Sequence, residues 1–150
     1  SEIQVKAMKE YAESKGLTVR VATISTVNDI QQAAQSLVGD VDVFYEPTDN
    51  VISSSIPTLV SVTDAAGKGV ICAEPFMVTG GCLATYGIDY YKLGVQTGEM
   101  AADILEGKSK PANMPIETAR DLTLVISKSG IEKLGLTIPE DVLKDATLVD

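Results

Sequence analysis

The chain has 150 residues, of which 45% are hydrophobic and 22% charged, the balance of a globular domain with a buried core. Its formal net charge of -9, with 12 Lys and Arg, offers no basic surface to nucleic acid or to an anionic membrane. The chain has no histidine, which excludes Ser-His and Cys-His nucleophile pairs and histidine metal ligands, so neither a cofactor nor a metal is expected.

Helical and strand patterns alternate along the chain, a rhythm that predicts an α/β domain with a parallel sheet. Helices are predicted over residues 2–15, 30–37, 50–66, 90–105, 127–134 and 139–144. Strands are predicted over residues 17–24, 41–45, 70–73, 83–88 and 122–126. Pro57 should kink the third helix or make it begin late, while residues 76–82 and 108–115 are expected to be irregular.

The strand predicted over residues 41–45 ends abruptly in Glu46-Pro47, before the polar residues Thr48, Asp49 and Asn50. Proline donates no backbone hydrogen bond and therefore breaks the ladder. Asp49 or Asn50 is expected to cap the next helix, which leaves other N–H groups facing the space beyond the strand. Because ligands bind at the carboxyl ends of strands in open α/β sheets, this loop is taken as the centre of a small-molecule site.

Two more carboxylates follow predicted strands. Glu74-Pro75 repeats the pattern of Glu46-Pro47, and Asp89 comes after the strand over residues 83–88. Taken singly, Asp49, Glu74 and Asp89 are best explained as helix caps or solvated carboxylates. Because all three follow strands of one parallel array, we expect them at the same edge of the sheet, and this convergence supports a site.

Aromatic side chains are rare here, at 5% of the residues, yet Tyr45, Tyr86 and Phe76 lie near these strand ends. Such side chains can form the apolar wall of a ligand pocket. Packing in the core explains Tyr45 and Tyr86 equally well.

Other notable residues have structural explanations. Cys72 and Cys82 lie in apolar surroundings outside any CxxC pattern, so two buried free thiols are expected. The serines at residues 53–55 are expected on a helix face. Gly67-Lys68 precedes a strand, whereas a P-loop follows one, which excludes that nucleotide motif. Gly94 and Gly98 in the longest predicted helix indicate a closely packed backbone.

Five motifs together resemble the substrate-binding proteins of ABC importers, in the tryptophan or amino-acid group of the type I periplasmic-binding-protein class. They are NDIQQA at residues 28–33, PTDN at 47–50, AEP at 73–75, GIDYYKLG at 87–94 and LGLTIP at 134–139. The resemblance spans nearly the whole chain, and the motifs are specific as a set. It implies an open, mostly parallel sheet with helices on both faces, in one of two lobes that close on a small ligand.

The resemblance also implies an organisation. Residues 1–150 would form a single α/β substrate-binding lobe, the carboxyl-terminal part of a two-lobed protein whose amino-terminal lobe is missing. The helix over residues 90–105 would cross to that lobe. With no lobe to cover it, this helix is expected to pair with a second copy in a homodimer rather than to fold back on its own sheet. The whole protein would be a lipoprotein at the extracellular or periplasmic face, and its partner would be an ABC transporter permease.

The function implied is capture of an aromatic or branched amino acid, without catalysis. Thr48 and the N–H groups ahead of the third helix would hold the ligand's carboxylate. Asp49, Glu74 or Asp89 would hold its ammonium group and Tyr45 or Tyr86 its side chain, with Asn50 in the same loop. Two alternatives stay open: a flavodoxin-like enzyme domain, and the effector-binding domain of a transcription regulator.

Overall fold

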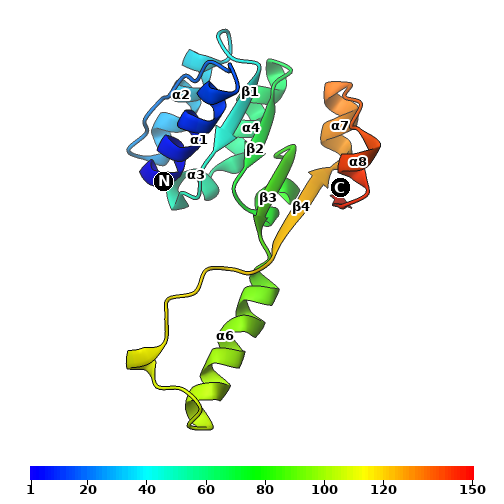
Figure 1. The fold of residues 1–150 in the computed structure, drawn as a ribbon. Helices are drawn as coiled ribbons and strands as arrows, with labels where there is room; N and C mark the ends of the chain where they lie inside the picture. Colours follow the sequence, from blue (N-terminus) through cyan, green and yellow to red (C-terminus); the bar gives the residue numbers. More distant parts are fainter.

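A computed structural model describes all 150 residues, and its five strands form one sheet in the order β1-β2-β3-β4-β5 (Figure 1). The strands are β1 (Val43–Glu46), β2 (Gly69–Cys72), β3 (Ala84–Ile88), β4 (Leu122–Ser127) and β5 (Ala146–Val149). β1, β2 and β3 are parallel, β4 is antiparallel to β3, and β5 is parallel to β4. The predicted open, mostly parallel α/β sheet is confirmed.

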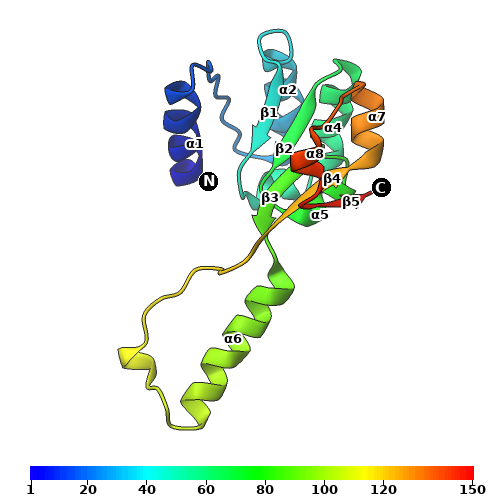
Figure 2. The same ribbon diagram turned by 45° about the vertical axis from the view of Figure 1, so that its right-hand side comes forward.

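Helices lie on both sides of this sheet. They are α1 (Glu2–Ser14), α2 (Ile30–Leu37), α3 (Asn50–Ser53), α4 (Ile56–Ala65), α5 (Pro75–Thr79), α6 (Tyr90–Leu105), α7 (Lys128–Leu134) and α8 (Glu140–Leu143), with short 3-10 turns at Val27–Asp29 and Pro111–Asn113. In Figure 1 α2 and α4 lie behind the sheet and α1 lies in front of it, whereas the turned view of Figure 2 shows α1 at the left and α8 in front. None of the helices combines the length and the apolar character that crossing a membrane requires.

The hydrophobic core occupies the face covered by α2, α4 and α5. Side chains alternate along the strands, so Phe44 and Val70 are buried in this core while Val43 and Tyr45 point to the other face. The core also contains Ile30, Ala34, Ile56, Leu59, Val60, Cys72, Met77, Val78, Cys82 and Val125. The other face is open, because α1 in front of it buries no residue.

The strand predicted over residues 17–24 is wrong. These residues are extended but pair with no strand, and most of their side chains are exposed. β1 is the edge strand of the sheet, so its outer side has no neighbour. Strand propensity reflects packing and pairing with neighbours, and this segment pairs with no strand and packs on the core only through Ile24.

Two other element predictions need correction. Residues 76–82 are not all irregular, because Pro75 opens α5 at a position where proline's fixed φ suits a helix. β5 was not predicted, and this short edge strand depends on its ladder with β4. The one departure from parallel pairing in this mostly parallel sheet is β4, which runs antiparallel to β3. Pro57 does start a new helix, α4, as proline in a first turn allows.

α6 projects away from the sheet, and the segment after it returns to β4 (Figures 1 and 2). Its one buried side chain, Gln96, donates to Glu117 Oε2 at 2.9 Å and to the Thr118 carbonyl at 3.0 Å. A Cβ at Gly94 or Gly98 would meet nothing within 4 Å, so the close packing predicted there has no partner in this chain. α6 does not fold back on its own sheet, and its lobe-crossing and dimer roles stay predictions.

Candidate functional site

Three parallel strands bring their carboxyl ends to one edge of the sheet. The register pairs Glu46 with Cys72 and Cys72 with Thr85, so the loops that follow β1 and β2 begin side by side, whereas β3 continues beyond them to Ile88 before its own loop begins. This edge, which we call the carboxyl edge, therefore carries most of the predicted ligand residues. They are Thr48, Asp49, Asn50, Glu74 and Asp89.

Thr48 is tied to α1. Gln4 Nε2 donates to Thr48 Oγ1 at 3.1 Å, and the Thr48 N–H donates to Gln4 Oε1 at 2.9 Å. The N–H groups of Asp49 and Asn50, in contrast, donate no hydrogen bond within the protein. These two N–H groups, rather than that of Thr48, are free to receive an anionic group.

Asp49 and Asp89 both cap helices. Asp49 Oδ1 accepts from the N–H groups of Val51 and Ile52 at 2.9 and 3.3 Å, and Asp89 Oδ1 accepts from the Lys92 N–H at 3.1 Å. The capping explanation thus holds for both residues. Each cap uses one carboxylate oxygen, so the other remains available to a ligand that the cap's geometry would hold in place.

Glu74 precedes α5 but makes no capping hydrogen bond with its side chain. The Tyr90 hydroxyl lies beside it, and burial together with the Glu74 charge raises the pKa of Tyr90. None of the ion pairs in the structure includes Asp49, Glu74 or Asp89. The carboxyl edge therefore carries negative charge without a basic partner, which favours a cationic group.

The two tyrosines lie on the open face of the sheet, so packing in the core does not explain them. Tyr45 is 37% exposed and Tyr86 69% exposed. Tyr45 pairs with Ile71 and Ile71 with Ala84, which places Tyr86, two residues after Ala84, on the same face as Tyr45. The structure thus puts both rings beside the carboxyl edge rather than in its loops.

Sequence reasoning missed Glu46. This last residue of β1 is 2% exposed, and neither of its carboxylate oxygens has a hydrogen-bond partner. Burial raises the pKa of Glu46 to about 7, the charges of Glu74 and Asp49 add to the rise, and the Ala73 backbone N–H beside the carboxyl group acts in the opposite direction. Its period-2 spacing from Phe44 could have indicated that the side chain faces the core.

Cys72 and Cys82 are buried free thiols, as predicted. Cys72 Sγ lies 3.5 Å from the Glu74 carbonyl oxygen and 3.6 Å from that of Ala84. No three His, Cys, Asp or Glu side chains come close enough to hold a metal ion. The thiols therefore stand as packed neighbours of Glu46 rather than as ligands.

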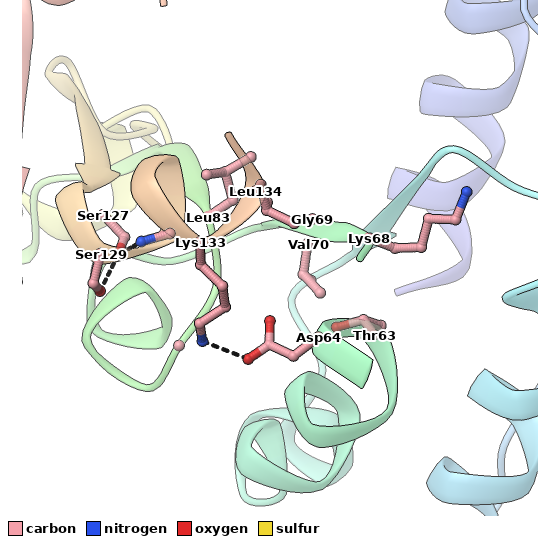
Figure 3. Close-up of a pocket in the computed structure, with 12 residues that line it drawn as sticks. Thr63, Asp64, Lys68, Gly69, Val70, Leu83, Ser127, Ser129, Lys133 and Leu134 are labelled. Carbon is pink, nitrogen blue, oxygen red and sulfur yellow. Dashed lines mark hydrogen bonds and ion pairs between the residues drawn. The ribbon is translucent and has the colours of Figure 1, made fainter. Parts of the chain in front are cut away.

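A small cavity lies at the opposite edge of the sheet, where β2 begins and β4 ends (Figure 3). Its volume of about 30 Å³ suits a water molecule rather than an amino acid. Lys133 Nζ approaches Asp64 Oδ2 at 2.6 Å across it, and Ser127 Oγ accepts from the Gly130 N–H at 2.9 Å. In this cavity the charges of Lys133 and Asp64 compensate each other, and the Ser127 hydroxyl is hydrogen-bonded.

Comparisons with known proteins identify the family. A family model described as ABC transporter substrate binding protein matches residues 1–150. A tyrosine-binding protein of Clostridioides difficile (strain R20291) is 39% identical over 136 residues, which cover 91% of this chain and 39% of that protein.

Two solved structures are also similar. One, an ABC domain from Streptococcus pneumonia in complex with L-Trp, has a TM-score of 0.88 and 38% identity, over 99% of this chain and 50% of that one. The other is a ligand-free, open substrate-binding protein with adhesive properties from Clostridium difficile. It has a TM-score of 0.78 and 38% identity, over 99% of this chain and 49% of that one. The chain thus spans half of these proteins or less.

Proposed function

We propose that this chain, which belongs to the ABC transporter substrate binding protein family, is one lobe of a protein that captures an amino acid at the carboxyl edge. Because the chain spans about half of its solved relatives, a second wall of the cleft would come from an amino-terminal lobe. α6, which buries only Gln96 within this chain, would belong to that second lobe. The family consists of substrate-binding proteins, which favours binding over the enzyme and regulator alternatives.

The uncompensated acids of the carboxyl edge carry this proposal. Asp49, Glu74 or Asp89, which have no basic partner, would hold the ligand's ammonium group. The unoccupied N–H groups of Asp49 and Asn50, with the Thr48 hydroxyl, would hold its carboxylate.

An aromatic amino acid is the ligand class we propose. Tyr45 and Tyr86 present exposed rings beside the carboxyl edge and would form an apolar wall. The names of the similar proteins, one tyrosine-binding and one solved with L-Trp, support the same class. The protein would act at the extracellular or periplasmic face, held there as a lipoprotein, and would deliver its ligand to an ABC permease.

Calorimetric titration of the intact, two-lobed protein with L-tyrosine and L-tryptophan tests the proposal. Asp49→Ala or Glu74→Ala should weaken binding by roughly 2 to 5 kcal/mol, because each change removes a carboxylate that pairs with a desolvated ammonium group. Asp64→Asn is the matched control, since its carboxylate lies at the opposite edge and pairs with Lys133. Unchanged affinity in both alanine variants would leave Asp49 and Glu74 as ordinary structural residues.

A further inference from the structure

Three side chains form a row across the covered face of the sheet: Glu46, Cys72 and Thr85, which we call the buried polar row. They stand opposite one another in the β1, β2 and β3 ladders and are 2%, 2% and 1% exposed. Both carboxylate oxygens of Glu46 and the Thr85 hydroxyl lack a hydrogen-bond partner. Unpartnered buried polar groups destabilise a fold, so such a row is expected where function retains it.

The charged and titratable groups that face Glu46 come from each element around it. Asp49 lies on the loop after β1 and Glu74 on the loop after β2, and both repel a charge on Glu46. The thiols of Cys72 and Cys82 and the Tyr45 hydroxyl complete the set. No basic side chain is among them, so Glu46 and the two predicted ammonium-binding carboxylates share one negative field.

We propose that Glu46 is a positioning residue of the amino-acid site, whose buried carboxyl group loses its proton when the ligand's ammonium group settles between Asp49 and Glu74. This inference rests on the proposed function. Glu46 would add a negative charge next to the loops that follow β1 and β2 when the ligand's ammonium group binds there. A ligand that lacks the ammonium group would meet a protonated, neutral Glu46 and gain nothing from it.

The direction of the pH effect follows from linkage. Without ligand, Glu46 faces carboxylates and keeps its proton until the pH reaches about 7. A nearby ammonium ion favours the charged carboxylate and so lowers the pKa of Glu46 in the complex. Binding then releases a proton, and the affinity must rise with pH until Glu46 is already ionised in the free protein.

Calorimetry on the intact protein with L-tyrosine tests this inference. From about pH 5.5 to about pH 8, the wild-type affinity should rise roughly tenfold, whereas that of Glu46→Gln, which cannot titrate, should change less than about twofold. Asp64→Asn, at the opposite edge of the sheet, is the control and should keep the wild-type pH profile. Repeating the titration in two buffers with different ionisation enthalpies counts the protons released.

Each outcome is decisive. A flat wild-type profile, or a Glu46→Gln profile as steep as that of wild type, overturns the role of Glu46 while binding itself still supports the proposed function. Absence of L-tyrosine and L-tryptophan binding at every pH overturns the proposed function and this inference with it. If circular dichroism shows that Glu46→Gln does not fold, the wild-type proton count decides. Release of about half a proton or more near pH 6 supports the inference, and release of none rejects it.

Discussion

The two edges of the sheet differ in how their charged groups are compensated. At the opposite edge, Lys133 pairs with Asp64 and the Ser127 hydroxyl caps α7. At the carboxyl edge, Asp49, Glu74 and Asp89 have no basic partner, and the buried Glu46 has no hydrogen-bond partner either. Uncompensated charges and unsatisfied buried polar groups lower stability and occur mainly at functional sites. The difference therefore supports a structural role for the opposite edge and a binding role for the carboxyl edge.

The largest expected effect concerns Glu46. Its pKa is about 7 in the folded protein against 4.5 for an ordinary glutamate, so the folded state binds the proton more tightly. Stability from this group is complete below pH 4.5 and is lost as the pH rises through 7. Glu46→Met has no carboxyl group to ionise. As the pH rises from about 4.5 to about 8, the free energy of unfolding of this variant should therefore increase by roughly 3 kcal/mol relative to that of wild type.

Urea unfolding of the intact protein at several pH values measures this gain. The control is Asp64→Asn, whose carboxylate lies at the opposite edge of the sheet, paired with Lys133 and away from Glu46. A wild-type minus Glu46→Met difference that stays constant with pH would show that Glu46 is not protonated in the fold, and would remove the main contrast between the edges.

Glycine substitutions compare the room available at each edge. A Cβ at Gly87 would lie 2.5 Å from the Ala73 carbonyl oxygen, a backbone atom that cannot easily move. Gly87→Ala should therefore lower the free energy of unfolding by about 1 to 3 kcal/mol. A Cβ at Gly130 would meet side-chain atoms no closer than 3.2 Å, and alanine favours the helix, so Gly130→Ala should change stability by less than about 1 kcal/mol.

Thermal unfolding of the two glycine variants gives the comparison directly. Equal losses in Gly87→Ala and Gly130→Ala would indicate that the carboxyl edge is no more tightly packed than the opposite one.

A smaller loss is expected from the cap at the opposite edge. Ser127→Ala removes the oxygen that accepts from the Gly130 N–H at 2.9 Å, and loss of such a cap costs about 1 kcal/mol. Ser36→Ala is the control, because the exposed Ser36 side chain lies within α2, bonds only to the Ala33 carbonyl and caps no helix end. Chemical unfolding should show the loss in the first variant only, and ligand affinity of the intact protein should be unchanged in both. A change in affinity would contradict a purely structural role for this edge.

The smallest effect is expected from the ion pair. Lys133 and Asp64 are 53% and 30% exposed, and such pairs contribute less than about 1 kcal/mol. Lys133→Met should lower the free energy of unfolding by no more than this, and 1 M salt should erase the difference, since the Debye length is then about 3 Å. A loss that persists in high salt would show that the cavity in Figure 3 depends on Lys133 for more than charge.

Local signals explain why α6 could be predicted from the sequence. The prediction and the structure agree on Tyr90–Leu105, because Asp89 supplies the cap and no proline interrupts the segment. The split at Pro57 follows from proline's missing N–H in the same way. Residues 17–24 and β5 were beyond such reasoning, because a strand exists only where a second strand pairs with it.

The sequence by itself determined four of the five strands, most of the helices and the placement of Asp49, Glu74 and Asp89 at the same edge, because parallel strands place their carboxyl ends together. Only the tertiary structure decided that β4 runs antiparallel, that Tyr45 and Tyr86 face away from the core, and that Glu46 is buried without a partner. The physical reason is that burial and hydrogen bonding depend on groups distant in the chain. In the sequence, Glu46 looks like an ordinary carboxylate at the end of a strand. Only the structure shows that its side chain is buried and has no basic neighbour.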